Sequence, residues 1–256
     1  MRPWAIAILV VVVVLCLGVV HPFGDPRIQS HHGGGTPLDS AKMADDAKTV
    51  LIKKCADCHS DETRWPVYAR IAPGSWLMER DVVEGRKHLN FSRWEELTAD
   101  EQQVLKAKIV QAARSEEMPP TLYLLLHPDA KLTASDIQKL SLLGKNVGGG
   151  EATLVGEGDS INGKVIFEKR CTGCHAIGVD REGPRLAGVY GRKAGTVPGF
   201  TYSAGLKHLG ATWDDATLER WLTDPDVMVP DNNMSFSVPK TEERRDLVAY
   251  LKRLSR

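Results

Sequence analysis

The stretch KRCTGCHAIG, residues 169–178, places two cysteines and a histidine within five positions. The stretch KKCADCHSDE, residues 53–62, repeats this arrangement more than a hundred residues earlier. Together they contain four of the chain's five cysteines, and only Cys16 lies elsewhere. The fold and function of this chain therefore have to account for a CxxCH segment that occurs twice.

A CxxCH segment suits the covalent attachment of haem. Two cysteines on one helical turn can form thioether links to both vinyl groups of a haem, and the histidine that follows then lies beneath the ring and reaches the iron. The spacing matters because both sulfurs and the imidazole must reach points fixed by a rigid macrocycle. The sequence therefore predicts attachment at Cys55, Cys58, Cys171 and Cys174, with His59 and His175 as proximal iron ligands.

Three other interpretations of CxxC are weaker. A thioredoxin-like CxxC is expected at the start of a helix after a strand, whereas both segments here follow predicted helices. A zinc site built from all four cysteines would leave the histidine after each pair redundant. Disulfides suit an exported chain, but CxxC disulfides are strained and usually catalytic. The repeated motif favours two covalently attached haem c groups.

The amino terminus carries an uncharged apolar run, residues 4–20. At about 1.5 Å per residue it extends about 25 Å, near the short limit for a bilayer span. Arg2 precedes it, which favours an exported remainder. A cleaved signal peptide is the alternative, although the run exceeds the usual ~7–15-residue apolar core. We predict that residues 1–21 form a transmembrane anchor or signal sequence, with the remaining domains on the periplasmic side of a bacterial inner membrane.

Glycine-rich stretches without apolar periodicity divide the rest of the chain. A flexible tether is expected at 22–42 and a glycine-rich linker at 147–158. They separate a haem-binding domain at 43–146 from a second domain at 159–256. Each domain holds one CxxCH segment.

Both domains are predicted to be helical. Ala47, Val50 and Leu51 recur at helical spacing ahead of the first motif, and Thr98 and Glu101 form a capping-box pair. No stretch alternates apolar and polar residues for more than a few positions. The predicted fold class is all-α, with two small helical c-type haem domains behind the N-terminal anchor.

Charge excludes one class of function. The chain has 33 basic and 33 acidic residues, so its formal net charge is zero with neutral histidines. Nucleic-acid binding of the usual electrostatic kind is therefore not expected.

The second domain carries a longer pattern around its CxxCH segment. In order it contains GKVIFEKRCTGCH, GPRLAGVYGRKAGTVPGFTYS, TWDDATLERWLTDP, VPDNNMSF and ERRDLVAYL. Over residues 159–256 this pattern resembles class I cytochrome c of the mitochondrial and bacterial short-chain type. The resemblance implies that the Pro184 carbonyl accepts the proximal imidazole N–H. It also implies that Tyr202 and Trp213 hydrogen-bond a buried haem propionate, with Arg192 nearby.

The same resemblance assigns a distal ligand. Met234 falls on the position of the distal methionine, with Met228 as its rival. A thioether–iron bond opposite a histidine raises the reduction potential and leaves no open coordination position. The resemblance also implies that Gly163 lets the first and last helices of the domain cross closely. One departure is Trp221, which replaces the usual tyrosine of its helix.

The first domain resembles a small bacterial haem-binding domain family. The resemblance rests on CADCHSDETRWPVYARIAPGSWLMERDVVEGRKHLNFSRW and EEMPPTLYLLLHPDAKLT. It implies haem attachment at the first CxxCH segment. Met118, held by two prolines, is the predicted distal ligand, with His127, His88 or an empty position as alternatives. Four aromatic residues are expected to wall the haem pocket: Trp65, Tyr68, Trp76 and Trp94.

These features predict a membrane-anchored di-haem c-type cytochrome that moves single electrons on the periplasmic side by Fe(III)/Fe(II) cycling. It is expected to be an electron carrier more than an enzyme. The expected partners are a redox protein donor and acceptor, such as a membrane respiratory complex. The alternative is a di-haem peroxidase, or a haem-based redox or gas sensor, with an open site in the N-terminal haem.

Overall fold

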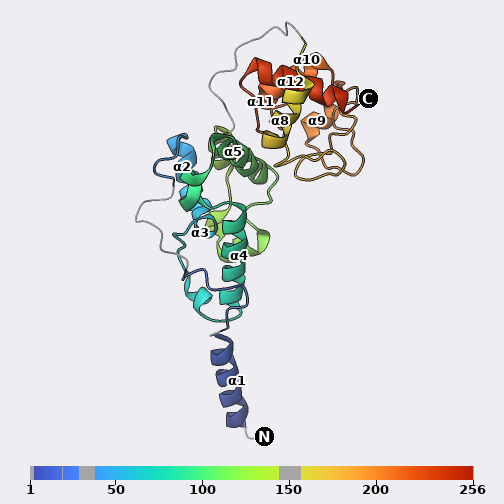
Figure 1. Cartoon of the computed structure of the whole chain (residues 1–256). Coiled ribbons are helices and arrows are strands. Elements are labelled where there is room, and N and C mark those ends of the chain that lie inside the picture. The colour runs from blue at the N-terminus through green and yellow to red at the C-terminus, as the bar shows by residue number, and fades with distance from the viewer. Residues whose placement is uncertain (1–2, 19, 29–37, 144–156, 256) are drawn as a thin grey trace. The chain divides into compact units, whose positions relative to one another are not determined.

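The chain folds almost entirely as helices and irregular loops (Figure 1). The computed structural model describes residues 3–18, 20–28, 38–143 and 157–255. Within these ranges there is no strand, and the only β-type pairing is an isolated bridge between Lys193 and Thr212. The predicted helical fold class is therefore confirmed for the described part of the chain. Contacts divide the chain into two compact units, Met1–Leu97 and Thr98–Arg256.

The described residues of the first unit form four α-helices and two short 3-10 helices. They are α1 (Pro3–Gly18), α2 (Asp45–Lys54), α3 (Ala56–His59), η1 (Val67–Arg70), α4 (Gly74–His88) and η2 (Phe91–Glu96). The predicted helix ahead of the first CxxCH segment is α2, and it buries Ala47, Val50 and Leu51 as expected. The motif itself forms α3, which packs against α4.

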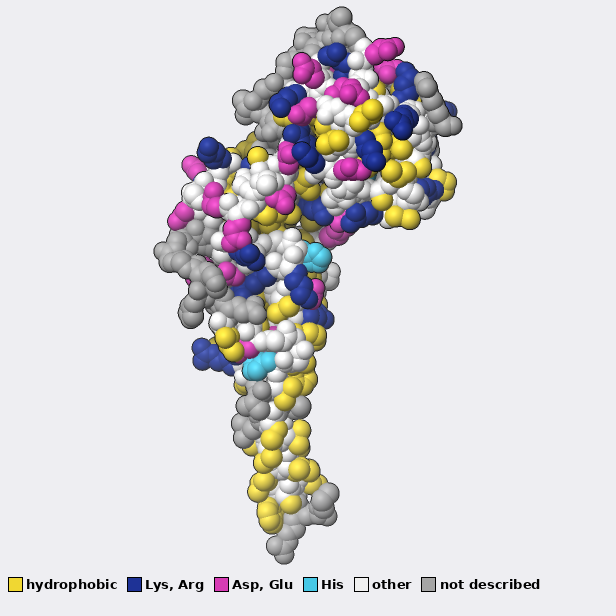
Figure 2. Space-filling view, in the orientation of Figure 1, with side chains coloured by type: hydrophobic (Ala, Val, Ile, Leu, Met, Phe, Trp, Pro, Cys, Tyr) yellow, Lys and Arg dark blue, Asp and Glu magenta, His cyan; other side chains and the backbone are white. Residues whose placement is uncertain are grey.

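Helix α1 is the apolar segment predicted as a membrane anchor. Figure 2 shows hydrophobic side chains over the visible face of this helix. In the described part of the chain, no helix combines the length and the apolar content needed to cross a membrane. The structure therefore does not support the predicted anchor over residues 1–21.

The second unit begins with three helices that lie outside the predicted 159–256 domain. They are α5 (Ala99–Arg114), α6 (Thr121–Leu126) and α7 (Ala134–Ser141), with η3 (Pro128–Ala130) between the last two. The predicted capping box at the start of α5 is confirmed. The Thr98 side chain accepts from the Glu101 backbone N–H, and the Glu101 carboxylate accepts from the Thr98 backbone N–H. Most of the predicted linker, residues 147–156, lies outside the described residues.

The other described residues of the second unit form five helices, of which α10 and α11 are separated by a single residue and the others by loops. They are α8 (Ser160–Arg170), α9 (Ala204–His208), α10 (Asp215–Thr223), α11 (Pro225–Met228) and α12 (Thr241–Arg253). Helices α8 and α12 cross closely at Gly163, where a Cβ atom would overlap the backbone carbonyl of Asp246. The predicted close approach is therefore present, and the ring centroids of Phe167 and Tyr250 lie 5.4 Å apart beside it.

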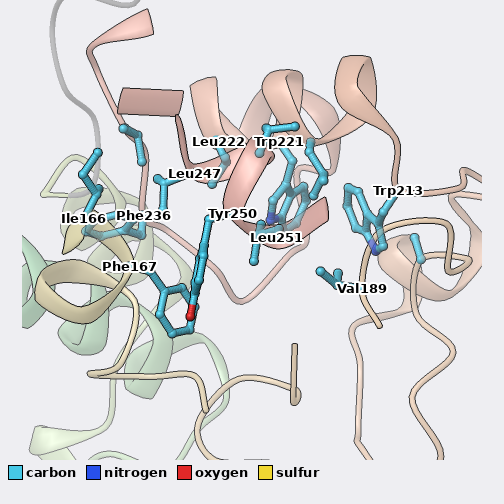
Figure 3. Packing of buried hydrophobic residues seen from close by; sticks show 14 of the residues in the cluster. Ile166, Phe167, Val189, Trp213, Trp221, Leu222, Phe236, Leu247, Tyr250 and Leu251 are labelled. Carbon is cyan, nitrogen blue, oxygen red and sulfur yellow. The ribbon is translucent and has the colours of Figure 1, made fainter. Parts of the chain in front are cut away.

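A single buried hydrophobic cluster holds these helices together (Figure 3). Phe167 from α8, Trp221 from α10 and Leu247 from α12 all contribute to it. Trp213, from the loop before α10, packs against Trp221 with ring centroids 5.4 Å apart. Ala107 joins the cluster from α5, so α5 packs onto the core of the second unit. This cluster forms the apolar wall of the cavity described next.

Candidate haem sites

The second unit encloses a cavity of about 520 Å³. This lies within the roughly 300–1,000 Å³ typical of ligand pockets. Its lining includes every residue that the sequence assigned to the second haem: Cys171, Cys174, His175, Pro184, Arg192, Tyr202, Trp213 and Met234. Residues more than sixty positions apart in sequence therefore converge on one cavity. Met228 is not part of the lining, whereas Met234 is.

The CxxCH segment of the second unit forms a turn that continues α8. Asp159 caps the start of α8 by accepting hydrogen bonds from the backbone N–H groups of Ile161 and Asn162. At the other end, the Cys171 carbonyl oxygen accepts from the Cys174 N–H at 3.1 Å and from the His175 N–H at 2.8 Å. This turn places both thiols and the imidazole along one wall of the cavity.

His175 is held in one orientation and one tautomer. Its Nδ1 lies 2.8 Å from the Pro184 carbonyl oxygen, which can only accept, so Nδ1 carries the proton. Nε2 is thereby left with a lone pair for a metal ion. Burial lowers the pKa of His175, which keeps the imidazole neutral, the form that binds metals.

Gly183 is a residue of this site that the sequence reasoning did not single out. A Cβ atom on Gly183 would lie 2.6 Å from Nδ1 and 2.7 Å from Nε2 of His175. The imidazole therefore packs directly on the glycine backbone. The signal was present in the sequence, since this glycine directly precedes the proline that holds the histidine.

Two hydrogen bonds position Met234. The Met234 backbone N–H donates to Asn232 Oδ1 at 2.7 Å, and the Trp221 indole Nε1–H donates to the Met234 sulfur at 3.1 Å. The Trp221 that departs from the family's tyrosine therefore supplies a hydrogen bond to the thioether. Asn232 is fully buried and was missed by the sequence reasoning.

Three polar side chains of the cavity are donors suited to a carboxylate. Burial raises the pKa of Tyr202 and lowers that of Arg192. Arg192 is held by hydrogen bonds to the carbonyl oxygens of Ala187 and Arg185, at 3.0 and 3.1 Å. Together with Trp213 they provide phenol, guanidinium and indole donors in one cavity. Their predicted role toward a haem propionate fits this placement and stays a prediction.

The first unit repeats the motif geometry. The Cys55 carbonyl oxygen accepts from the Cys58 N–H at 3.2 Å and from the His59 N–H at 3.0 Å. His59 Nδ1 lies 3.1 Å from the Leu89 carbonyl oxygen, which again leaves Nε2 for a metal ion. Burial also lowers the pKa of His59. Leu89 was not identified from the sequence, because a backbone acceptor thirty residues away leaves no side-chain signal.

Helix α4 supports this motif from one side. A Cβ atom on Gly85 would lie 2.6 Å from the Cys58 carbonyl oxygen, so only glycine permits the close packing. Arg86 donates from Nε to the Ser60 carbonyl oxygen at 2.8 Å, directly after the proximal histidine. These contacts fix the chain on both sides of His59.

The predicted aromatic wall of the first haem is only partly buried. Trp94 is 1% exposed, whereas Trp65, Tyr68 and Trp76 are half-buried. The structure adds Phe91, which is 2% exposed and whose ring centroid lies 6.1 Å from that of His59. Phe91 and Trp94 both come from η2, so this short helix supplies the buried aromatic surface.

The distal ligand of the first haem stays a prediction. Met118 belongs to the second compact unit and is 44% exposed. His127, also in that unit, stacks on Tyr123 with centroids 4.2 Å apart. His88 is the last residue of α4 and is exposed.

The cysteines differ from those of redox-active CxxC sites. Burial raises the pKa of Cys58 and of Cys171 to about 12, and raises that of Cys174 as well. Reactive CxxC thiols have lowered pKa values instead. All five cysteines lie in the described residues and none forms a disulfide. Within those residues no group of three metal-binding His, Cys, Asp or Glu side chains comes together. These thiols therefore lack the lowered pKa that activates cysteines for thiol–disulfide exchange.

Comparisons with known proteins agree with the two-part division of motifs. A family model described as a haem-binding domain matches residues 14–143, and a cytochrome c model matches residues 160–255. Cytochrome c of Euglena viridis is 42% identical over 100 residues, which cover 38% of this chain and 98% of that protein. Cytochrome c of Tetrahymena pyriformis is 45% identical over 100 residues, covering 38% and 91%.

A solved structure, cytochrome cH from Methylobacterium extorquens, is 40% identical and covers 38% of this chain and 99% of its own, with a TM-score of 0.36. The matched residues 160–255 contain the whole predicted ligand set of the second site. The chain therefore belongs to the cytochrome c family, as a haem-binding domain followed by a cytochrome c domain that serves haem-based electron transfer.

Proposed function

We propose that this chain is a di-haem c-type cytochrome that carries single electrons outside the cytoplasm. The observation that carries the proposal is the repeated geometry of the two motifs. In both, the histidine after CxxC turns Nδ1 toward a backbone carbonyl oxygen, at 3.1 Å for His59 and 2.8 Å for His175. Such a bond fixes ring orientation and increases the basicity of the nitrogen that binds iron. Each unit then holds one haem.

A covalently attached haem supplies one-electron Fe(III)/Fe(II) chemistry. The chain's own residues keep the coordination constant between the two states. Pro184 and Leu89 hold the imidazoles, and Trp221 holds the sulfur of Met234, the proposed distal ligand in the second unit. The buried apolar wall excludes water and stabilises the less charged reduced state. Rigid ligands and low solvent exposure both favour rapid electron transfer.

Location and partners belong to the same proposal. The uncharged apolar run of residues 4–20 supports export, either as a retained helix that attaches the chain to a bacterial inner membrane or as a signal sequence. The domains would then face the periplasm. The partners of a one-electron carrier are a redox protein donor and acceptor, such as a membrane respiratory complex.

Carbon monoxide separates this function from the peroxidase and sensor alternatives. Ferrous haem binds carbon monoxide only where a coordination position is open or its ligand is displaced. The reduced full-length chain is expected to show no carbon monoxide complex in its absorption spectrum at neutral pH. A complex formed by one of the two haems would contradict simple electron transfer and favour an open site, with Cys55→Ala/Cys58→Ala identifying the haem responsible.

A further inference from the structure

Arg114 lies outside the cytochrome c match yet contacts the loop that carries Met234. It is the last residue of α5, and its side chain is only 13% exposed. Nη1 and Nη2 donate to the two carboxylate oxygens of Asp226, at 2.8 and 3.0 Å. Nη1 also donates to the Asn232 carbonyl oxygen at 2.8 Å, and Nη2 to Ser141 Oγ at 2.9 Å. The guanidinium therefore connects α7 and α11 to residues 229–240, the loop that carries Met234, called the methionine loop below.

Asn232 connects this guanidinium to the methionine. Its Nδ2 donates to Asp226 Oδ1 at 2.9 Å and to the Val229 carbonyl oxygen at 2.7 Å. Its Oδ1 accepts from the Met234 N–H at 2.7 Å. One buried side chain therefore separates the carboxylate held by Arg114 from the backbone of the proposed iron ligand.

The methionine loop depends on these bonds because it has little secondary structure of its own. Helix α11 ends at Met228 and α12 begins at Thr241. Buried backbone groups need hydrogen-bond partners, and outside helices and strands side chains supply part of them. A bidentate guanidinium–carboxylate pair is among the strongest and most directional of these. Loss of the guanidinium would remove a hydrogen-bond donor from the Asn232 carbonyl oxygen and both arginine donors from the Asp226 carboxylate. Such a loss is costly here because the Asp226 side chain is only 18% exposed.

Helix α5 is also attached to the second unit without Arg114. Asp100 accepts from Arg170 Nε at 2.9 Å, and Gln103 donates to the Ser237 carbonyl oxygen at 2.8 Å. Ala107 belongs to the buried cluster. A change at Arg114 therefore acts on the methionine loop first, while α5 keeps its other contacts.

We propose that Arg114 is a positioning residue for the distal methionine of the second haem. The inference rests on the proposed function, because it takes Met234 as the ligand. It assigns to α5, a helix that precedes the cytochrome c domain, a part in setting the coordination of the haem in that domain. Arg114 acts through Asp226 and Asn232, and it stabilises the loop conformation in which Met234 faces the cavity.

The test compares three variants of the full-length haem-loaded chain. Arg114→Ala removes all four hydrogen bonds, and Arg114→Lys keeps the charge but loses the bidentate fork. Lys164→Ala is the control, because Lys164 lies on α8 and pairs at 3.6 Å with Glu168, both side chains are 58% exposed, and neither residue lines the cavity. Two signals are read: the near-infrared charge-transfer band of methionine-ligated ferric haem, and imidazole binding to the ferric protein. Met234→Ala defines complete loss of the second haem's band.

Arg114→Ala is expected to weaken the band and to tighten imidazole binding by about tenfold or more. Arg114→Lys should give an intermediate effect, and it replaces the alanine variant if that variant fails to fold. Lys164→Ala should leave both signals unchanged. If both Arg114 variants carry haem and give wild-type signals, while the band still depends on Met234, the role of Arg114 is overturned. The assignment of Met234 as ligand then still stands. A wild-type chain whose band does not depend on Met234 would overturn the ligand assignment as well.

Discussion

At the scale of single residues, the histidines predicted as proximal ligands have the same local environment in both units. His59 and His175 each direct Nδ1 to a carbonyl oxygen, and burial lowers the pKa of each. The CxxCH motif predicted both histidines, and the family resemblance predicted the Pro184 carbonyl. Neither the motif nor the resemblance predicted the Leu89 carbonyl. Any residue type can offer a backbone acceptor, and the hydrogen bond depends on how the thirty residues between His59 and Leu89 fold.

Gly183 gives a direct test of how closely the His175 imidazole is packed. Gly183→Ala places a methyl group against the ring, and overpacking of this kind costs about 1–3 kcal/mol. We expect a lower thermal midpoint and a weakened methionine band for the second haem, measured by absorption on heating. Gly178→Ala is the control, because nothing lies within 4 Å of a Cβ atom there. Equal midpoints for the two variants would contradict the packing argument.

Trp221 provides a residue-scale test of the thioether environment. The indole N–H donates to the Met234 sulfur at 3.1 Å and so withdraws electron density from the ligand. A weaker sulfur donor stabilises ferrous iron relative to ferric iron. Trp221→Phe keeps an aromatic ring without the donor, and the reduction potential of the second haem should fall by tens of mV, since a net hydrogen bond contributes about 0.5–1.5 kcal/mol. Spectroelectrochemical titration measures this, and an unchanged or raised potential would refute it.

At the scale of elements, helix starts were predictable and the contacts of α5 were not. The Thr98–Glu101 pair identified the start of α5 because a capping box is a local pattern. The packing of Ala107 and Arg114 against the C-terminal helices and loops depends on residues more than fifty positions away. The glycine-rich linker placed α5 in the predicted domain at 43–146, as does the haem-binding family match over 14–143, while the contacts within the structure group α5 with the second unit.

The crossing of α8 and α12 is the element-scale contact that the sequence did predict. Gly163→Ala is expected to destabilise the second unit by about 1–3 kcal/mol, because the added methyl group overlaps the Asp246 carbonyl. Urea unfolding followed by haem absorption measures the change. Val165→Ala, on the same helix at a position 44% exposed, is the control and should change stability by less than about 0.5 kcal/mol. A glycine variant as stable as the control would contradict the close crossing.

At the scale of the whole molecule, two units each hold a CxxCH segment. The helical class, both motifs and the convergence of the second site followed from the sequence and its resemblance to class I cytochrome c. The predicted membrane anchor is not supported, because no helix in the described ranges is both long and apolar enough to cross a membrane. Met118 stays a prediction as the distal ligand of the haem-binding domain, with His127, His88 or an empty position as alternatives, because no spacing rule like that of CxxCH links a distal ligand to the motif.

The most direct test of the central claim is the intact mass of the full-length chain after expression with a c-type haem maturation system. The account predicts the mass of the polypeptide plus two haem groups that stay attached under denaturing conditions. Replacing Cys55 and Cys58 with alanine should remove one of them and leave the other on Cys171 and Cys174. A mature chain that carries a single covalent haem, or none, would contradict the claim that each unit holds a haem.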